Sequence, residues 1–101
     1  MHRVEIAISA THPAFAGHFP GDPLLPGVSL LAEVLEAVLA VPAIAAQVGA
    51  APRIGAAKFL APVRPGAQLN IALEPGARGV RFEVRDGERL AASGTFESAA
   101  A

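Results

Sequence analysis

His18 is the side chain in this sequence best suited to proton transfer. Imidazole titrates near neutrality, so at working pH it can be neutral and accept a proton. Gly17 precedes His18 and Pro20 follows it, and a proline-fixed loop of this kind can hold the ring rigidly against a substrate. The other two histidines, His2 and His12, are scattered along a chain without cysteine. No metal site is therefore predicted.

The backbone N–H groups of Gly27 and Val28 are the second feature that can do chemistry. They stand after Pro26, where a helix is predicted to begin. The first N–H groups of a helix have no partner within it, and the positive end of the helix dipole lies beside them. The sequence therefore predicts donors that favour a developing negative charge at this position.

A helix and a long loop are predicted to position these groups. Residues 28–40 are good helix formers, apolar on nearly every face, and they end before Pro42, so we expect a buried helix. Residues 43–51 are rich in alanine and predict a short helical turn. Residues 10–27 carry four prolines and three glycines, which indicates an irregular segment longer than an ordinary connection. Loops of that length are usually functional or disordered, and the apolar content here argues against disorder.

Five segments are predicted to form strands. Apolar and polar residues alternate with period two in residues 4–8, 69–73 and 80–85, and residues 53–63 and 90–96 are predicted to complete the sheet. Turns between the later strands are expected at Arg64-Pro65-Gly66, at Pro75-Gly76 and at Asp86-Gly87. One strand, one helix and then an antiparallel meander predict an α+β domain whose sheet can wrap around the helix.

Length and composition bound the kind of protein. The 101 residues fit a single domain, residues 1–101. Hydrophobic residues make up 52% of so short a chain, and this excess favours burial against a partner subunit. The formal net charge is −1, with basic residues scattered among acidic ones, so neither nucleic acid nor a membrane surface is an expected partner. Without cysteine, a signal sequence or a long apolar run, the chain is predicted to be cytoplasmic.

Two segments resemble the signature of hotdog-fold 3-hydroxyacyl-acyl carrier protein (ACP) dehydratases, the family of the FabZ and FabA enzymes. The first is HFPGDPLLPGV, residues 18–28, and the second is KFLAPVRPGAQL, residues 58–69. Their spacing is also that of the family, and the resemblance covers nearly the whole chain. It implies a hotdog fold, in which an antiparallel sheet wraps around one long central helix. It also implies a dimer with both active sites at the subunit interface.

The resemblance further implies roles for individual residues. Elimination of water from a 3-hydroxyacyl thioester needs a base for the proton next to the carbonyl, an acid for the departing hydroxyl and donors for the enolate-like oxygen. His18 corresponds to the base; outside this motif it would be interpreted as a structural loop histidine. Gly27 and Val28 correspond to the donors, and Gly27 lets the thioester come close. Phe19 and Pro26 join them as substrate-binding residues.

The acid is missing from its expected position. The family places Glu or Asp four residues after the position of Val28, and this chain has Ala32 there. Glu33 lies ~100° further round the helix, whereas Glu36 lies on nearly the same face as Ala32, one turn or ~5 Å deeper. Glu33 is the better candidate for a displaced acid, because a small shift of the helix start would bring it to the substrate. The alternative is that both carboxylates form the solvated or ion-paired edge of the helix.

The leading hypothesis is a dehydratase-like protein that converts 3-hydroxyacyl-ACP to trans-2-enoyl-ACP in fatty-acid or polyene-type biosynthesis. Its expected partners are ACP, with the acyl chain on 4′-phosphopantetheine, and a second hotdog subunit, identical or related. No cofactor is expected. One alternative is a catalytically incomplete subunit that binds acyl-ACP or completes a heterodimeric dehydratase, and Ala32 favours it. The other is a hotdog thioesterase, against which the His18 loop argues.

Overall fold

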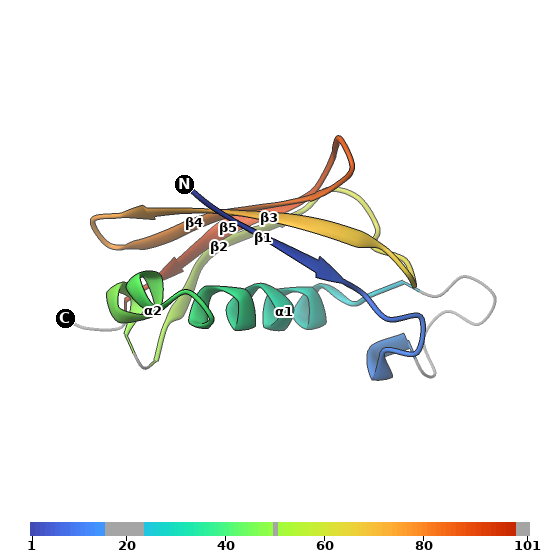
Figure 1. Cartoon of the computed structure of the whole chain (residues 1–101), viewed down its shortest axis with the longest axis horizontal. Helices are drawn as coiled ribbons and strands as arrows, with labels where there is room; N and C mark the ends of the chain where they lie inside the picture. The colour runs from blue at the N-terminus through green and yellow to red at the C-terminus, as the bar shows by residue number, and fades with distance from the viewer. Residues whose placement is uncertain (16–23, 50, 99–101) are drawn as a thin grey trace.

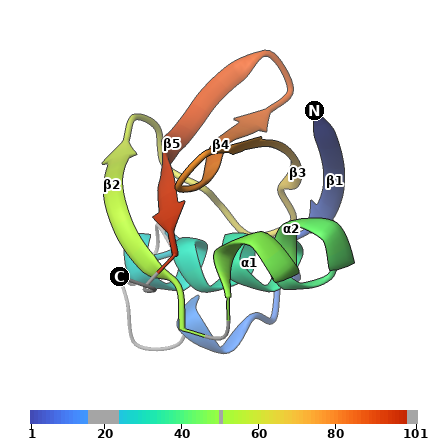
Figure 2. The same cartoon turned by 90° about the vertical axis from the view of Figure 1, so that its left-hand side faces the viewer.

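The computed structural model describes residues 1–15, 24–49 and 51–98, which form one curved antiparallel sheet packed over a helix (Figure 1). The five strands of the described residues lie in the order β1-β3-β4-β5-β2. The elements are β1 (His2–Ala7), the 3-10 turn η1 (Pro13–Phe15), α1 (Gly27–Leu39), α2 (Pro42–Val48), β2 (Arg53–Phe59), β3 (Gln68–Gly76), β4 (Gly79–Asp86) and β5 (Arg89–Glu97). Figure 2 shows the sheet curving around α1. The α+β architecture predicted from the sequence is therefore confirmed.

Helix α1 buries one face and leaves another uncovered. Leu30, Val34, Ala37 and Val38 recur at helical spacing and are buried under the sheet. The prediction of a helix buried all round is wrong for this single chain, because Val28 is 76% exposed and Leu39 is also exposed. One sheet can cover only one side of a helix, so the remaining apolar side is free for another contact.

The central strands supply the other half of the core through simple alternation. Leu69, Ile71 and Leu73 of β3 point inward and are buried, and so are Val80, Phe82 and Val84 of β4. Between them, residues such as Arg81 and Glu83 fall on the opposite face of the sheet. The core thus lies between the concave face of the sheet and the buried face of α1.

Two of the predicted turns lie later in the chain than expected. Pro75 and Gly76 remain in β3, opposite Val80 and Gly79, so the turn consists of Ala77 and Arg78. Asp86 remains in β4 opposite Arg89, whose Nη2 lies 3.5 Å from Asp86 Oδ2. The two-residue loop is Gly87-Glu88, with Gly87 at φ 64°, and the strand pairing continues up to it. The turn at Arg64-Pro65-Gly66 is confirmed, with Gly66 at φ 82°.

Strand β2 is shorter than predicted and lies at the edge of the sheet. It ends at Phe59, because the next two residues, Leu60 and Ala61, both donate their N–H groups to the carbonyl of Ala91 and the chain turns toward Pro62. Every residue of β2 is exposed on both faces of the strand. An uncovered apolar edge strand is a ready surface for pairing with another chain.

Within the described residues, no single helix is long and apolar enough to cross a membrane. Helices α1 and α2 meet the length and composition of a span only when taken together, and the chain bends by 113° between them.

Candidate active site

The two motif segments come together at the N-terminus of α1. The N–H of Leu25, from the first segment, donates to the carbonyl of Val63, from the second, at 2.8 Å. Between them lies an open hollow of about 460 Å³. Its lining is apolar and comes from both segments: Leu24, Leu25, Pro26, Gly27, Leu30, Phe59, Leu60, Ala61, Pro62 and Val63. Such a hollow suits an acyl chain, because it offers apolar surface and few polar groups.

The first backbone donors of α1 lie beside this hollow. Pro26 precedes the helix with extended backbone angles, and its carbonyl accepts from Ser29 and Leu30 at 3.0 Å each. Among the described residues, no hydrogen bond engages the N–H groups of Gly27 and Val28. The N-terminus of α1, with the positive end of the helix dipole, therefore lies at the rim of the hollow.

Phe59 covers the backbone of Gly27. A Cβ atom added at Gly27 would lie 2.8 Å from Phe59 Cζ, so only a residue without a side chain permits this approach. The structure places the Phe59 ring at the hollow, with the residue still 50% exposed, so it is not a core residue of the single chain.

The predicted site residues divide into three groups. His18 and Phe19 lie outside the described residues. Pro26, Gly27 and Val28 lie together at the start of α1, as expected. Ala32, one turn further along α1, is exposed. Glu33 contacts His12.

Glu33 forms a hydrogen bond with His12. Glu33 Oε1 lies 2.9 Å from His12 Nε2, and the N–H of Ala14 donates to His12 Nδ1 at 3.0 Å. Because Nδ1 accepts a hydrogen bond, the hydrogen-bond pattern assigns the ring proton to Nε2, which donates it to the carboxylate. His12 and Glu33 lie 21 positions apart in the sequence, one after β1 and the other in α1. Periodicity relates only neighbouring turns of a helix or residues of a strand, so the sequence pattern does not indicate this contact.

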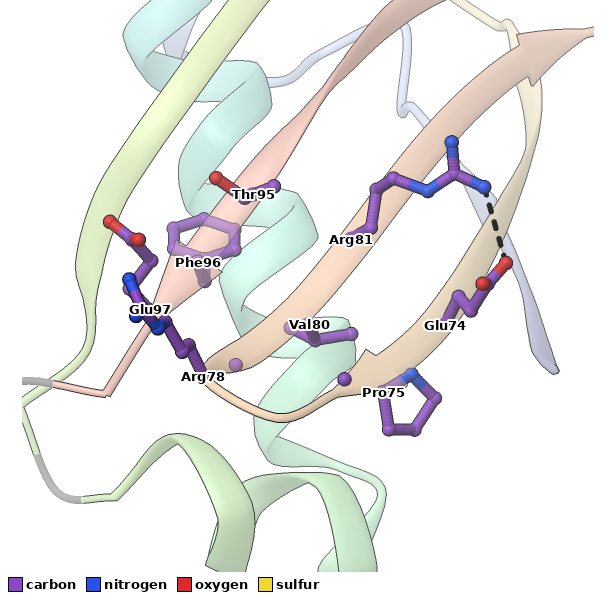
Figure 3. Close-up of a pocket in the computed structure, with 10 residues that line it drawn as sticks. Glu74, Pro75, Arg78, Val80, Arg81, Thr95, Phe96 and Glu97 are labelled. Atoms are coloured by element: carbon purple, nitrogen blue, oxygen red, sulfur yellow. Dashed lines mark hydrogen bonds and ion pairs between the residues drawn. The ribbon is translucent and has the colours of Figure 1, made fainter.

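A second hollow is lined by residues of the β3–β4 hairpin and of β5 (Figure 3). Figure 1 shows this hairpin at the end of the molecule away from the start of α1. The second hollow has a volume of about 260 Å³, and its polar lining includes Glu74 and Arg81, paired at 3.2 Å. Both of these side chains are about half exposed. The hollow lies far from both motif segments, so we do not place the reaction there. No group of three metal-ligating side chains occurs among the residues that the structure describes.

Comparison with known proteins gives related dehydratases. The family model of ApeI dehydratases matches residues 1–95. The chain is 39% identical over 71 residues to the 3-hydroxyacyl-[acyl-carrier-protein] dehydratase FabZ of Symbiobacterium thermophilum, covering 66% of this chain and 50% of the relative. It is 38% identical over 82 residues to FabZ of Chloroflexus aggregans, covering 75% and 57%. The chain thus spans little more than half the length of these curated relatives.

Solved structures agree in fold over nearly the whole chain. The dehydratase heterocomplex ApeI:P from Xenorhabdus doucetiae matches with a TM-score of 0.73 and 25% identity, covering 94% of this chain and 83% of that one. An uncharacterized protein from Erwinia carotovora subsp. atroseptica matches with a TM-score of 0.72 and 30% identity, covering 94% and 79%. Sheet order, central helix, paired motif segments and family match agree, and the chain belongs to the ApeI-like dehydratase family of hotdog proteins.

Proposed function

We propose that this chain is a subunit of a 3-hydroxyacyl-ACP dehydratase and eliminates water from the acyl thioester to give the trans-2-enoyl product. The observation that carries the proposal is the meeting of both motif segments around an apolar hollow at the N-terminus of α1. The FabZ relatives, named for this reaction on ACP-bound substrates, support the substrate class.

The proposed chemistry divides among three groups. His18 removes the proton from the carbon next to the thioester carbonyl, and the electrons form the new double bond as the 3-hydroxyl leaves as water. The N–H groups of Gly27 and Val28 stabilise the negative charge on the thioester oxygen. Phe19 and Pro26 contact the substrate, and the hollow beside Pro26 holds the first carbons of the acyl chain.

The acid that protonates the departing hydroxyl comes, in this proposal, from a second hotdog subunit. Ala32 has no group that can donate a proton, and the Glu33 carboxylate already accepts the His12 Nε2–H. The related Xenorhabdus structure is described as a heterocomplex. A site completed by a neighbouring chain therefore accounts for a family member that lacks its own acid.

An apolar surface on this chain supports such a neighbour. We call it the α1–β2 surface; its members are the exposed residues Val28, Leu39, Ile54, Phe59 and Leu60. The contact between Phe59 and Gly27 joins its strand and helix parts, and Figure 2 shows β2 beside α1. Large exposed apolar residues on a small protein are candidates for an interaction surface.

Charging the α1–β2 surface should separate the subunits. We expect the purified chain to be a dimer, because the uncovered β2 edge and its apolar residues favour pairing. Ile54→Lys should shift it to the 10.2 kDa monomer, measured by light scattering after size-exclusion chromatography. Ala77→Lys places the same charge in the exposed β3–β4 turn and serves as the control. A wild-type chain that is monomeric at tens of micromolar would contradict the assignment of this surface.

Adding a methyl group at Gly27 should impair the reaction more than the fold. The methyl of Gly27→Ala would meet the Phe59 ring at 2.8 Å, so the ring must swing toward the hollow where the thioester is to lie. We expect kcat/KM to fall roughly 10-fold to 100-fold, since small displacements of reacting groups have effects of that size. Gly76→Ala is the matched control, because a Cβ there has no neighbour within 4 Å. Equal kcat/KM for both variants would argue against substrate binding at Gly27.

The direct test of the function is an assay with 3-hydroxyacyl-ACP and, in the reverse direction, enoyl-ACP. Mass spectrometry of the carrier protein follows the loss or gain of water over a series of chain lengths. We expect slow conversion by the chain alone and faster conversion when a carboxylate is restored at position 32. Absence of conversion in both cases would refute the proposed function, and release of free fatty acid would indicate a thioesterase instead.

A further inference from the structure

The pair formed by His12 and Glu33 joins the segment after β1 to the central helix. The His12 and Glu33 side chains are only 22% and 25% exposed, so the contact is largely shielded from water. Its 2.9 Å separation is that of a good hydrogen bond. Partly buried pairs of this kind are screened less than surface pairs, and they hold the elements that carry them in a defined relation.

His12 is itself fixed at the centre of a turn. Its N–H donates to the carbonyl of Ser9, and its carbonyl accepts from the N–H of Phe15, each at 3.0 Å. The Ala14 N–H holds the ring at Nδ1, and the Phe15 ring meets it edge to face with centroids 6.0 Å apart. An interaction at His12 Nε2 therefore positions the whole of η1.

The turn η1 leads directly into the motif that contains His18. Only Ala16 and Gly17 stand between Phe15 and His18 in the sequence, so the covalent chain limits the distance between the Phe15 and His18 Cα atoms to roughly 11 Å. Phe15 packs against the buried core, so the start of this short connection is anchored. Glu33 sits on the same helix as the Gly27 and Val28 donors. The pair thus ties the chain that carries the base to the helix that carries the oxyanion donors.

We propose that Glu33 is a positioning residue, which acts through His12 to hold η1, the turn that precedes the His18 motif, against α1. This inference rests on the proposed function. It differs from the prediction that Glu33 is a displaced acid, in which the Glu33 carboxyl would give its proton to substrate. To do so, the Glu33 carboxyl would have to be protonated and turn toward the substrate, which would leave the Nε2–H of the mostly buried His12 ring without its acceptor.

Two substitutions of Glu33 separate these roles. Glu33→Gln keeps an oxygen that can accept the His12 Nε2–H but has no acidic proton, so it should retain most of the wild-type kcat. Glu33→Ala removes the acceptor and should lower kcat by on the order of 10-fold to 100-fold with little change in KM. His12→Ala should have the same effect, and the double variant should be no worse than either single one, because all three break the same contact.

These rates are measured in the wild-type or the Ala32→Glu background, whichever shows turnover. The control is Glu74→Ala, which removes the carboxylate of the exposed pair with Arg81 in Figure 3 and should leave kcat unchanged. If Glu33→Gln is as slow as Glu33→Ala, Glu33 donates a proton and the positioning role is wrong. If Glu33→Ala keeps full activity, the pair has no role in the reaction.

A second readout does not depend on turnover. Nitrogen-15 spectra of the His12 ring should show the proton on Nε2 in the wild type and in Glu33→Gln, and a mixture of tautomers in Glu33→Ala. Hydrogen exchange at the Ala14 amide should be faster in Glu33→Ala than in the wild type or Glu33→Gln, because the His12 ring that accepts the Ala14 N–H is then no longer held. Unchanged exchange would overturn the positioning role. A complete lack of dehydration together with the expected exchange pattern would instead refute the proposed function alone.

Discussion

Replacing His18 by alanine should lower the rate of dehydration by about 10²-fold to 10⁴-fold, the usual contribution of a general base. The reason is chemical: no other titratable side chain stands in the two motif segments with a proton affinity suited to neutral pH. The measurement is single-turnover conversion of 3-hydroxyacyl-ACP, which reports the elimination step without product release.

The His18→Ala experiment needs controls for the fold and for loss of a histidine as such. His2→Ala removes an exposed imidazole from the first residue of β1 and should leave the rate unchanged. Thermal unfolding of His18→Ala is measured beside that of the wild type, so that a loss of rate caused by unfolding is distinguished from the loss of the base. Unchanged turnover in His18→Ala would remove the base from the proposed mechanism.

Much of the fold could be predicted from the sequence because local patterns decide it. Alternation along β3 and β4 specified which side chains are buried, since one face of each strand meets the core and the other meets solvent. Pro26 and Pro42 bracketed α1 closely. Proline has no N–H to donate, so it is tolerated at the start of a helix but disrupts its interior. Turn positions were less exact: Asp86-Gly87 has the right composition, yet the pairing of Asp86 with Arg89 extends the hairpin by one residue.

The candidate site was predictable in part, and its long-range contacts were not. The motif segments identified Gly27 and Val28 as the helix start, and the structure adds that Phe59 covers Gly27. Nothing in the spacing of His12 and Glu33 indicates their pairing, because it depends on where the loop after β1 crosses α1. Exposure of β2 was equally hidden, since RIGAAKF has the composition of a strand with a covered face.

Restoring a carboxylate with Ala32→Glu should raise dehydration by the chain alone by about 10²-fold to 10⁴-fold, the contribution of a general acid. Ala32 lies on an exposed part of α1, so a longer side chain meets no buried neighbour there. It follows Val28 by four residues and shares its face of the helix. Single-turnover rates for the wild type, Ala32→Glu and Ala32→Gln measure the effect, and the glutamine variant controls for size without an acidic proton.

The gain from Ala32→Glu should outweigh its cost to the helix. Placing a carboxylate four residues before Glu36 adds a like-charge pair worth only about 0.2–0.5 kcal/mol, whereas a 10²-fold rate increase corresponds to about 2.7 kcal/mol of transition-state stabilisation. If the wild type already turns over rapidly and Ala32→Glu adds nothing, the acid lies elsewhere in the chain. If Glu33→Gln also shows no dehydration, the two results together would identify Glu33 as the proton donor. If only Ala32→Glu is active, the natural site requires a carboxylate from a second subunit.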